Sequence, residues 1–219
     1  DPEEIVGSMP AAESKTPALV ARHAQHTPDR HSDASVQPLI ILFDQSASMK
    51  ADMGGRRRID IARESFKQWA KKLQGRANVG IRFFASGTNN EDEAGNCLTS
   101  EEIITLGEQV QSSDLKRLAA KAQPIGRKTN IAHALEVAKQ DLAGKGPGKI
   151  LLISDGIENC ERDPVEQARE LGDMGITVDV LGIGPAEDIG GLGKIALASG
   201  GRLDIAANQI ELQQKMGNA

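Results

Sequence analysis

The chain has 219 residues, with 31 acidic and 26 basic side chains and a formal net charge of −5. Acidic and basic residues are both spread along the chain, whereas a dedicated nucleic-acid-binding protein needs a clustered basic face. Aromatic residues make up 2% of the chain and tyrosine is absent, which argues against an aromatic platform for single-stranded nucleic acid or sugar. No apolar stretch approaches the roughly 20 residues that span a bilayer, so we expect no membrane insertion by this segment.

Residues 1–36 are rich in Pro, Ala, Ser, Thr and His and show no sustained hydrophobic period. Such composition is typical of a flexible N-terminal arm or linker. Residues 37–219 are predicted to form one folded domain. The sequence begins at Asp1 rather than at methionine, which leaves room for an upstream signal or membrane anchor.

A continuous apolar run at residues 38–43 predicts a strand that is buried on both faces. Three oxygen-bearing side chains follow it at alternating positions: Asp44, Ser46 and Ser48. A loop that curls off the strand tip can turn all three toward one point. Such hard oxygen donors suit Mg²⁺ or Mn²⁺ rather than Zn²⁺.

Strand and helix signals alternate along the rest of the chain. Residues 57–73 predict an amphipathic helix, because their apolar side chains recur at helical spacing. The run Arg56-Arg57-Arg58 at its start is expected to be a solvated turn or part of a ligand rim. The further predicted elements, in order, are a strand at 78–85, an exposed loop at 86–96, a short mixed segment at 101–106 and a helix at 113–121.

The second half continues the same alternation. A loop at 124–130 is followed by a helix at 131–142, for which Thr129 or Asn130 is the expected cap. Asp163 and Pro164 predict the start of another helix, as its cap and first helical residue. The other predicted elements are strands at 150–154, 176–183 and 202–205, with helices to 174, at 189–199 and at 208–216.

Helices between apolar strands predict an α/β fold: a doubly wound, mostly parallel central sheet flanked by helices. Ligands of such sheets bind at the carboxyl ends of the strands. Asp44 and Asp155 each follow a predicted strand. We therefore expect both carboxylates at one edge of the sheet, which is the geometry that a metal site needs.

The segments Asp44-Gln45-Ser46-Ala47-Ser48, Lys128-Thr129-Asn130 and Ser154-Asp155-Gly156 together resemble the metal-ion-dependent adhesion site of von Willebrand factor type A domains. They match it in residue type, order and approximate spacing, with Ala47 in place of the usual glycine. The resemblance covers about residues 36–216. The segment from Asp155 to Cys160 is similar to a bacterial branch of secreted, periplasmic or membrane-anchored proteins.

The resemblance implies five metal ligands: Asp44, Ser46, Ser48, Thr129 and Asp155. In that family the serines bind the ion directly, the threonine directly or through water, and the carboxylates largely through water. The implied ion is Mg²⁺, with Mn²⁺ or Ca²⁺ as alternatives. Its open position would accept a carboxylate of a partner protein, so we expect a non-enzymatic protein–protein binding module that is periplasmic, extracellular or on the cell surface.

The two cysteines, Cys97 and Cys160, do not form a zinc motif, because there is no second pair. Related bacterial domains carry cysteines at both places, so the resemblance implies a disulfide that joins two loops. Two unpaired thiols are the alternative. A disulfide would indicate an oxidising compartment.

Two other functions compete with metal-dependent binding. One is a scaffold domain of a larger secreted or membrane-associated complex, without a metal-bridged ligand. The other is an aspartyl phosphotransferase with Asp44 as nucleophile, but that chemistry wants a second aspartate at position 46, where the chain has Ser46, and therefore lacks its general acid. A serine hydrolase is disfavoured because no nucleophile-elbow motif occurs.

Overall fold

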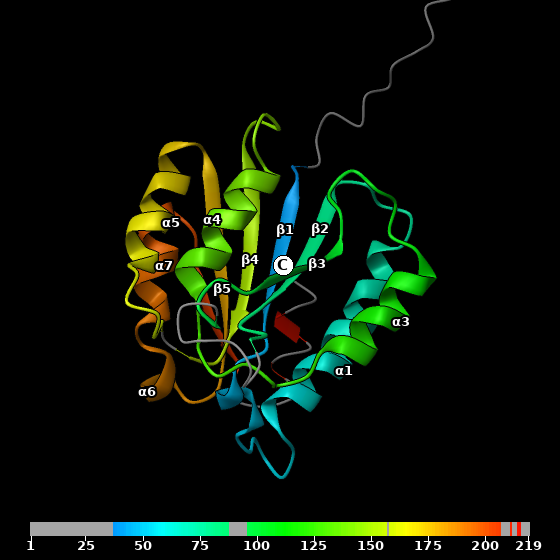
Figure 1. Cartoon of the computed structure of the whole chain (residues 1–219), viewed down its shortest axis with the longest axis vertical. Helices are drawn as coiled ribbons and strands as arrows, with labels where there is room; N and C mark the ends of the chain where they lie inside the picture. Colours follow the sequence, from blue (N-terminus) through cyan, green and yellow to red (C-terminus); the bar gives the residue numbers. More distant parts are fainter. Residues whose placement is uncertain (1–36, 88–95, 157, 207–210, 212–213, 216–219) are drawn as a thin grey trace, which may run out of the picture. The chain divides into compact units, whose positions relative to one another are not determined.

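The computed structural model describes residues 37–87, 96–156, 158–206, 211 and 214–215. Within this part, six strands form one sheet in the order β3-β2-β1-β4-β5-β6 (Figure 1). The strands are β1 (Leu39–Asp44), β2 (Val79–Phe84), β3 (Ser100–Ile104), β4 (Gly148–Ser154), β5 (Ile176–Ile183) and β6 (Leu203–Ala206). Neighbouring strands are parallel except β2 and β3, which are antiparallel. This confirms the predicted α/β fold with a mostly parallel sheet.

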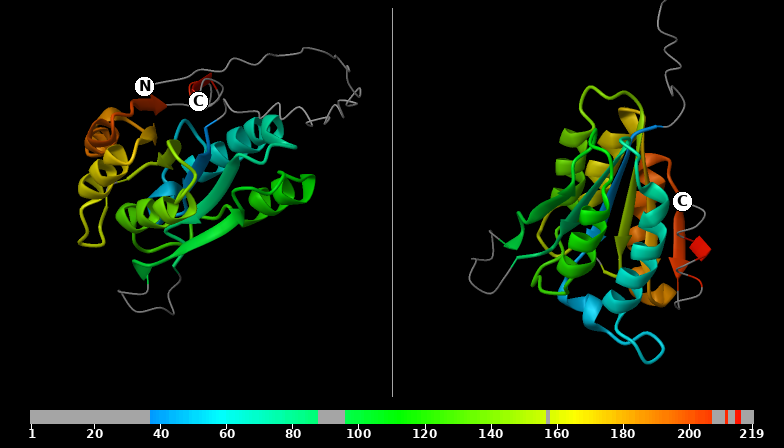
Figure 2. Two further views of the ribbon diagram at one scale, coloured as in Figure 1. Left: turned by 90° about the horizontal axis from the view of Figure 1, so that it is seen from above. Right: turned by 90° about the vertical axis from the view of Figure 1, so that its right-hand side faces the viewer.

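Helices cover both faces of the sheet. In Figures 1 and 2, α1 and α3 lie together on one face, while α4, α5 and α7 lie on the other. The helices are α1 (Arg58–Ala70), α3 (Ser112–Lys121), α4 (Ile131–Asp141), α5 (Pro164–Asp173), α6 (Ala186–Ile189) and α7 (Leu192–Ser199), with the 3₁₀ turns η1 (Ala47–Lys50) and η2 (Lys71–Leu73).

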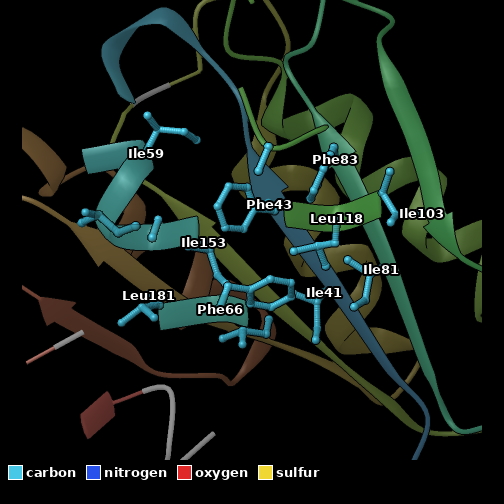
Figure 3. Packing of buried hydrophobic residues seen from close by; sticks show 14 of the residues in the cluster. Ile41, Phe43, Ile59, Phe66, Ile81, Phe83, Ile103, Leu118, Ile153 and Leu181 are labelled. Atoms are coloured by element: carbon cyan, nitrogen blue, oxygen red, sulfur yellow. The ribbon is translucent and has the colours of Figure 1, made fainter. Parts of the chain in front are cut away.

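The central strand β1 contributes to the hydrophobic core on both faces. Ile41 and Phe43 belong to the cluster beneath α1 and α3, which Figure 3 shows, whereas Ile40 and Leu42 belong to the cluster beneath α4, α5 and α7. The Phe43 ring packs 5.5 Å from that of Phe66 on α1 and 5.4 Å from that of Phe83 on β2, between ring centroids. This double burial explains why the run has no polar residue, since alternate side chains of a strand point to opposite faces.

Several boundaries differ from the sequence-based expectation. The mixed segment forms the antiparallel edge strand β3, and β4 begins at Gly148, two residues before the predicted start. A short helix α6 precedes α7. The expected N-terminal arm at residues 1–36 lies outside the described residues, as does most of the expected closing helix at 208–216. Of the helices in the described part, none is both long and apolar enough to cross a membrane.

The topology places the end of β1 in the middle of the sheet, because β1 lies between β2 and β4. At the carboxyl ends of these strands, the chain leaves β1 for η1 and leaves β4 for the loop before α5. In Figure 1 this edge is the lower end of the sheet, where η1 lies and α1 begins. Loops that are distant in sequence therefore gather beside the tip of β1.

Candidate metal centre

Asp44 is the last residue of β1 and is fully buried. One carboxylate oxygen, Oδ1, accepts a hydrogen bond from the backbone N–H of Ser46 at 2.7 Å. The other, Oδ2, accepts a hydrogen bond from the Ser154 hydroxyl at the end of β4. The carboxylate is thus held by its own loop and by the neighbouring strand.

The two serines of the first loop bring their hydroxyl groups together. Ser46 Oγ lies 2.9 Å from Ser48 Oγ, within hydrogen-bonding distance, and Ser48 Oγ donates to Asp155 Oδ1 at 2.7 Å. The turn η1 begins directly after Ser46 and curls the chain so that both side chains lie on one side. Ser46 is buried while Ser48 is exposed, so the cluster extends from the interior to the surface.

Asp155 follows β4 and is 2% exposed. Its second oxygen, Oδ2, accepts a hydrogen bond from Arg58 Nη1 at 3.0 Å, in an ion pair whose side chains are 10% and 0% exposed. The run was expected to be a solvated turn or part of a ligand rim, and its residues divide between these two alternatives. Arg56 and Arg57 are exposed, but Arg58 is buried against a predicted metal ligand.

Thr129 lies in the second loop, which reaches the first loop through Gly126. Gly126 donates its N–H to the carbonyl of Gln45 at 3.0 Å, beside a parallel bridge to Ser46. A Cβ at position 126 would lie 1.5 Å from the carbonyl oxygen of Ala85, so only glycine fits this close approach.

The second and third loops are joined by a reciprocal pair of hydrogen bonds. The Thr129 N–H donates to Asn159 Oδ1 at 2.6 Å, and the Asn159 N–H donates to the Thr129 carbonyl at 3.0 Å. A Cβ placed on Gly156 would lie 3.5 Å from Ser48 Oγ and 3.9 Å from Thr129 Oγ1. The hydroxyls of the first and second loops therefore both lie over Gly156.

Side chains that the sequence analysis did not assign to the site support these loops. Glu158 accepts hydrogen bonds from the N–H groups of Ala132 at 2.7 Å and Cys160 at 3.0 Å, so it caps α4 from another loop. Asn130 is at the N-cap position of α4, as expected, but its side chain makes no capping hydrogen bond there. Asn130 instead accepts from the Ala85 N–H at 2.9 Å through its side chain.

A disulfide joins Cys97 to Cys160, with an S–S distance of 2.00 Å and a sequence separation of 63 residues. It links the loop after β4 to the segment that precedes β3. The third loop is therefore covalently attached at one end and follows a buried strand at the other.

The pKa values of both carboxyl groups in the cluster are raised because the groups are buried. Burial and, next, the negative charge of Asp155 raise the pKa of Asp44 from 3.8 to about 7, against hydrogen bonds from Ser154 and Ser46. The pKa of Asp155 is also raised, because burial outweighs its hydrogen bonds from Ser48 and Arg58. Each carboxylate would ionise more readily if a positive charge were added nearby.

The donor set fits a hard divalent cation. Its members are two carboxylates and three hydroxyls, oxygen ligands of the kind that Mg²⁺, Mn²⁺ and Ca²⁺ prefer. Among the described residues, no group of three or more His, Cys, Asp or Glu side chains is placed to hold a metal ion. A site here would therefore depend on hydroxyl as well as carboxylate oxygens.

Comparison with known proteins identifies the family. A model of the von Willebrand factor type A domain matches residues 39–216. The curated protein YwmD of Bacillus subtilis (strain 168), described as uncharacterized, is 31% identical over 194 residues, which are 85% of this chain and 84% of that protein.

Two solved structures share the fold at lower identity. The pilus adhesin SpaC from Lactobacillus rhamnosus GG superimposes with a TM-score of 0.64 and 16% identity, covering 84% of this chain and 30% of that one. Proximal thread matrix protein 1 from the mussel byssus, in a form with a zinc-occupied metal-ion-dependent adhesion motif, superimposes with a TM-score of 0.55 and 20% identity, covering 83% and 46%. On the extent of the family match and the identity to YwmD, the chain belongs to the von Willebrand factor type A domain family.

Proposed function

We propose that the loops after β1, before α4 and after β4 bind a divalent cation, Mg²⁺ foremost, which bridges this domain to a carboxylate of a partner protein. Ser46, Ser48 and Thr129 would hold the ion, and Asp44 and Asp155 would orient its bound water. The ion would supply an electrophilic centre for the partner's carboxylate.

The observation that carries this proposal is the convergence of the three loops. Oxygen atoms of Ser46, Ser48 and Asp155 form one hydrogen-bonded chain, and Thr129 Oγ1 lies close to the same glycine as Ser48 Oγ. Helix capping would explain any one of these hydroxyl or carboxyl groups, but it does not require residues from three loops to meet. The exposed end of the cluster at Ser48 gives a ligand access.

The relatives support the same function. SpaC is a pilus adhesin, and the byssus protein held zinc at its adhesion motif. By analogy, this domain would act in adhesion or in assembly of a complex, in the periplasm or outside the cell. The disulfide supports an oxidising compartment. We propose no enzymatic role. An aspartyl phosphotransferase needs a general acid at position 46, and the hydroxyl group of Ser46 donates a proton much less readily than a carboxyl group does.

The test is calorimetric binding of a short peptide with one aspartate, compared with the same peptide carrying asparagine. We expect the aspartate peptide to bind in Mn²⁺ and not in excess chelator, and the asparagine peptide to bind in neither. Ser48→Ala should lose the binding, whereas Ser113→Ala on an exposed part of α3 should keep it. Aspartate binding that survives chelation, or metal binding without any carboxylate preference, would favour the scaffold function instead.

A further inference from the structure

Arg58 differs from the other arginines of its run in that it belongs to the metal centre. Its N–H donates to the carbonyl of Ala51 at 2.9 Å where α1 begins, and its side chain extends to Asp155. Arg57, by contrast, is exposed and pairs locally with Asp60 at 2.6 Å. Of these two adjacent arginines, Arg58 therefore pairs with a buried carboxylate that is 97 residues away in sequence.

The end of β5 is shaped around this guanidinium. Gly184, directly after β5, has a φ of +132°, and a Cβ there would lie 3.0 Å from both Cζ and Nη2 of Arg58. Any larger residue at position 184 would strain the backbone and press on the guanidinium. The positive charge is therefore enclosed between α1 and the ends of β4 and β5.

Asp155 uses its two oxygens differently. Oδ1 accepts from Ser48, in the hydroxyl cluster, while Oδ2 accepts from Arg58. Arg58 therefore contacts the carboxylate without occupying the oxygen that belongs to the hydroxyl cluster. A guanidinium has no lone pair for a metal and remains charged at all working pH values.

Three charged side chains lie at the hydroxyl cluster: Asp44, Asp155 and Arg58. With both carboxylates ionised, Asp44, Asp155 and Arg58 leave one net negative charge, and a bound divalent ion turns this into one net positive charge. Without the guanidinium the loaded site would be neutral. A low-dielectric, buried setting strengthens such differences relative to water.

We infer that Arg58 is a specificity-determining residue, which weakens metal binding and strengthens binding of an anionic ligand to the loaded site. The inference rests on the proposed metal-bridging function. Its physical reason is that a fixed positive charge repels the cation and attracts the partner's carboxylate. Arg58 would thereby shift the two affinities in opposite directions, because the same charge acts with opposite sign on the cation and on the acidic ligand.

The experiment compares chelator-stripped wild type with Arg58→Gln, Arg58→Met and Arg58→Lys at pH 8. Mn²⁺ is titrated first, and acetate is then titrated into the Mn²⁺-loaded protein while the proton relaxation of bound water is followed. Arg57→Gln is the matched control, because it removes the neighbouring exposed charge. Thermal unfolding of each variant shows whether it is folded, and Arg58→Met replaces Arg58→Gln if the latter fails to fold.

We expect the neutral variants to bind Mn²⁺ at least about tenfold more tightly and acetate about tenfold more weakly than wild type, given one buried unit charge. The affinities of Arg58→Lys and Arg57→Gln for Mn²⁺ and for acetate should both stay within about threefold of the wild-type values. Neutral variants that bind Mn²⁺ as weakly as wild type or more weakly would overturn this inference and leave the metal site standing. No Mn²⁺ binding by any variant or by wild type would overturn both.

Discussion

The faces of the sheet and its carboxyl edge are built from opposite kinds of residue. The faces are packed with aliphatic and phenylalanine side chains that are essentially unexposed, such as Ile41, Phe43 and Leu152. The edge between β1, β4 and the start of α4 also buries side chains, but these are Asp44, Asp155 and the hydroxyl groups of Ser46 and Thr129. Burial of apolar surface is favourable, whereas burial of carboxylates is costly without partners.

We propose on this basis that the faces stabilise the domain, whereas the edge serves the function. The edge is tolerated because each carboxylate has hydrogen-bond donors or an ion pair. Substitutions on the faces should therefore lower stability without a specific effect on metal binding. Substitutions at the edge should change binding and pH dependence more than the fold.

Phe43→Ala should cause the largest loss of stability. The ring is fully buried and packs against Phe66 and Phe83, and removing such a side chain costs about 3–5 kcal/mol. The measurement is the free energy of unfolding in urea. Leu197→Ala is the control, because this side chain on α7 is 80% exposed. Equal effects of the two substitutions would contradict the packing described for this face.

The disulfide should contribute nearly as much, although it lies at the edge. Closing a loop across 63 residues stabilises the folded state by about 4 kcal/mol on the chain-entropy model. Cys97→Ser combined with Cys160→Ser should lower the unfolding free energy by roughly this amount and weaken metal binding, because the loop of Asp155 loses its anchor. Unchanged stability of the double variant would show that the bond constrains little.

The raised pKa of Asp44 predicts an unusual pH dependence of the metal-free protein. Between the unfolded pKa of 3.8 and the folded pKa of about 7, the folded state holds a proton that the unfolded state releases, so rising pH should destabilise the fold. One pKa unit corresponds to about 1.4 kcal/mol, which gives a loss of about 3 kcal/mol or more between pH 4 and 7.5 from this group.

The measurement is urea unfolding in chelator across that pH range, for wild type and Asp44→Asn. The asparagine amide does not ionise in this pH range, so the variant should lack this component of the pH dependence. Saturating Mg²⁺ should reduce the loss in wild type, because the ion favours the ionised carboxylate. A wild type and variant with the same pH profile would contradict burial of an ionisable Asp44.

Glu158→Gln should have the smallest effect of these substitutions. The glutamate carboxylate accepts from two backbone N–H groups, at the start of α4 and in its own loop, and a cap of this kind contributes about 1 kcal/mol. Thermal unfolding measures the loss, with Glu161→Gln, an exposed neighbour, as the control. A destabilisation of several kcal/mol would mean that the loop has more than a capping role.

The faces of the sheet were predictable from sequence because their signal is local. The apolar run of β1 and the helical spacing of α1 each follow from residues that are close in the chain. The N-cap at Asp163 is of the same kind: its carboxylate accepts from the Val165 N–H at 2.8 Å, as expected. The edge strand β3 was missed as a strand because only Ile103 and Ile104 of its five residues are apolar, and they follow Glu101 and Glu102. Charged residues of this kind are usual at a sheet edge.

The edge was predictable only in part. The strand ends placed Asp44 and Asp155 together, and the resemblance to the family supplied Thr129 and the pairing of the cysteines. The ion pair of Arg58 with Asp155 and the roles of Glu158 and Asn159 were not predicted, because each depends on a partner far away in sequence. A charged residue at the start of a helix is usually solvated, and no pattern in the basic run distinguishes Arg58 from Arg57.

We propose that the carboxyl edge of the sheet holds a divalent cation. The most direct test is calorimetric titration of Mg²⁺ and Mn²⁺ into chelator-stripped protein at pH 8, with wild type beside Asp44→Asn. We predict saturable binding at one site in wild type and its loss in the variant, which should remain folded. Absence of binding in folded wild type, or equal binding by the folded variant, would contradict the claim.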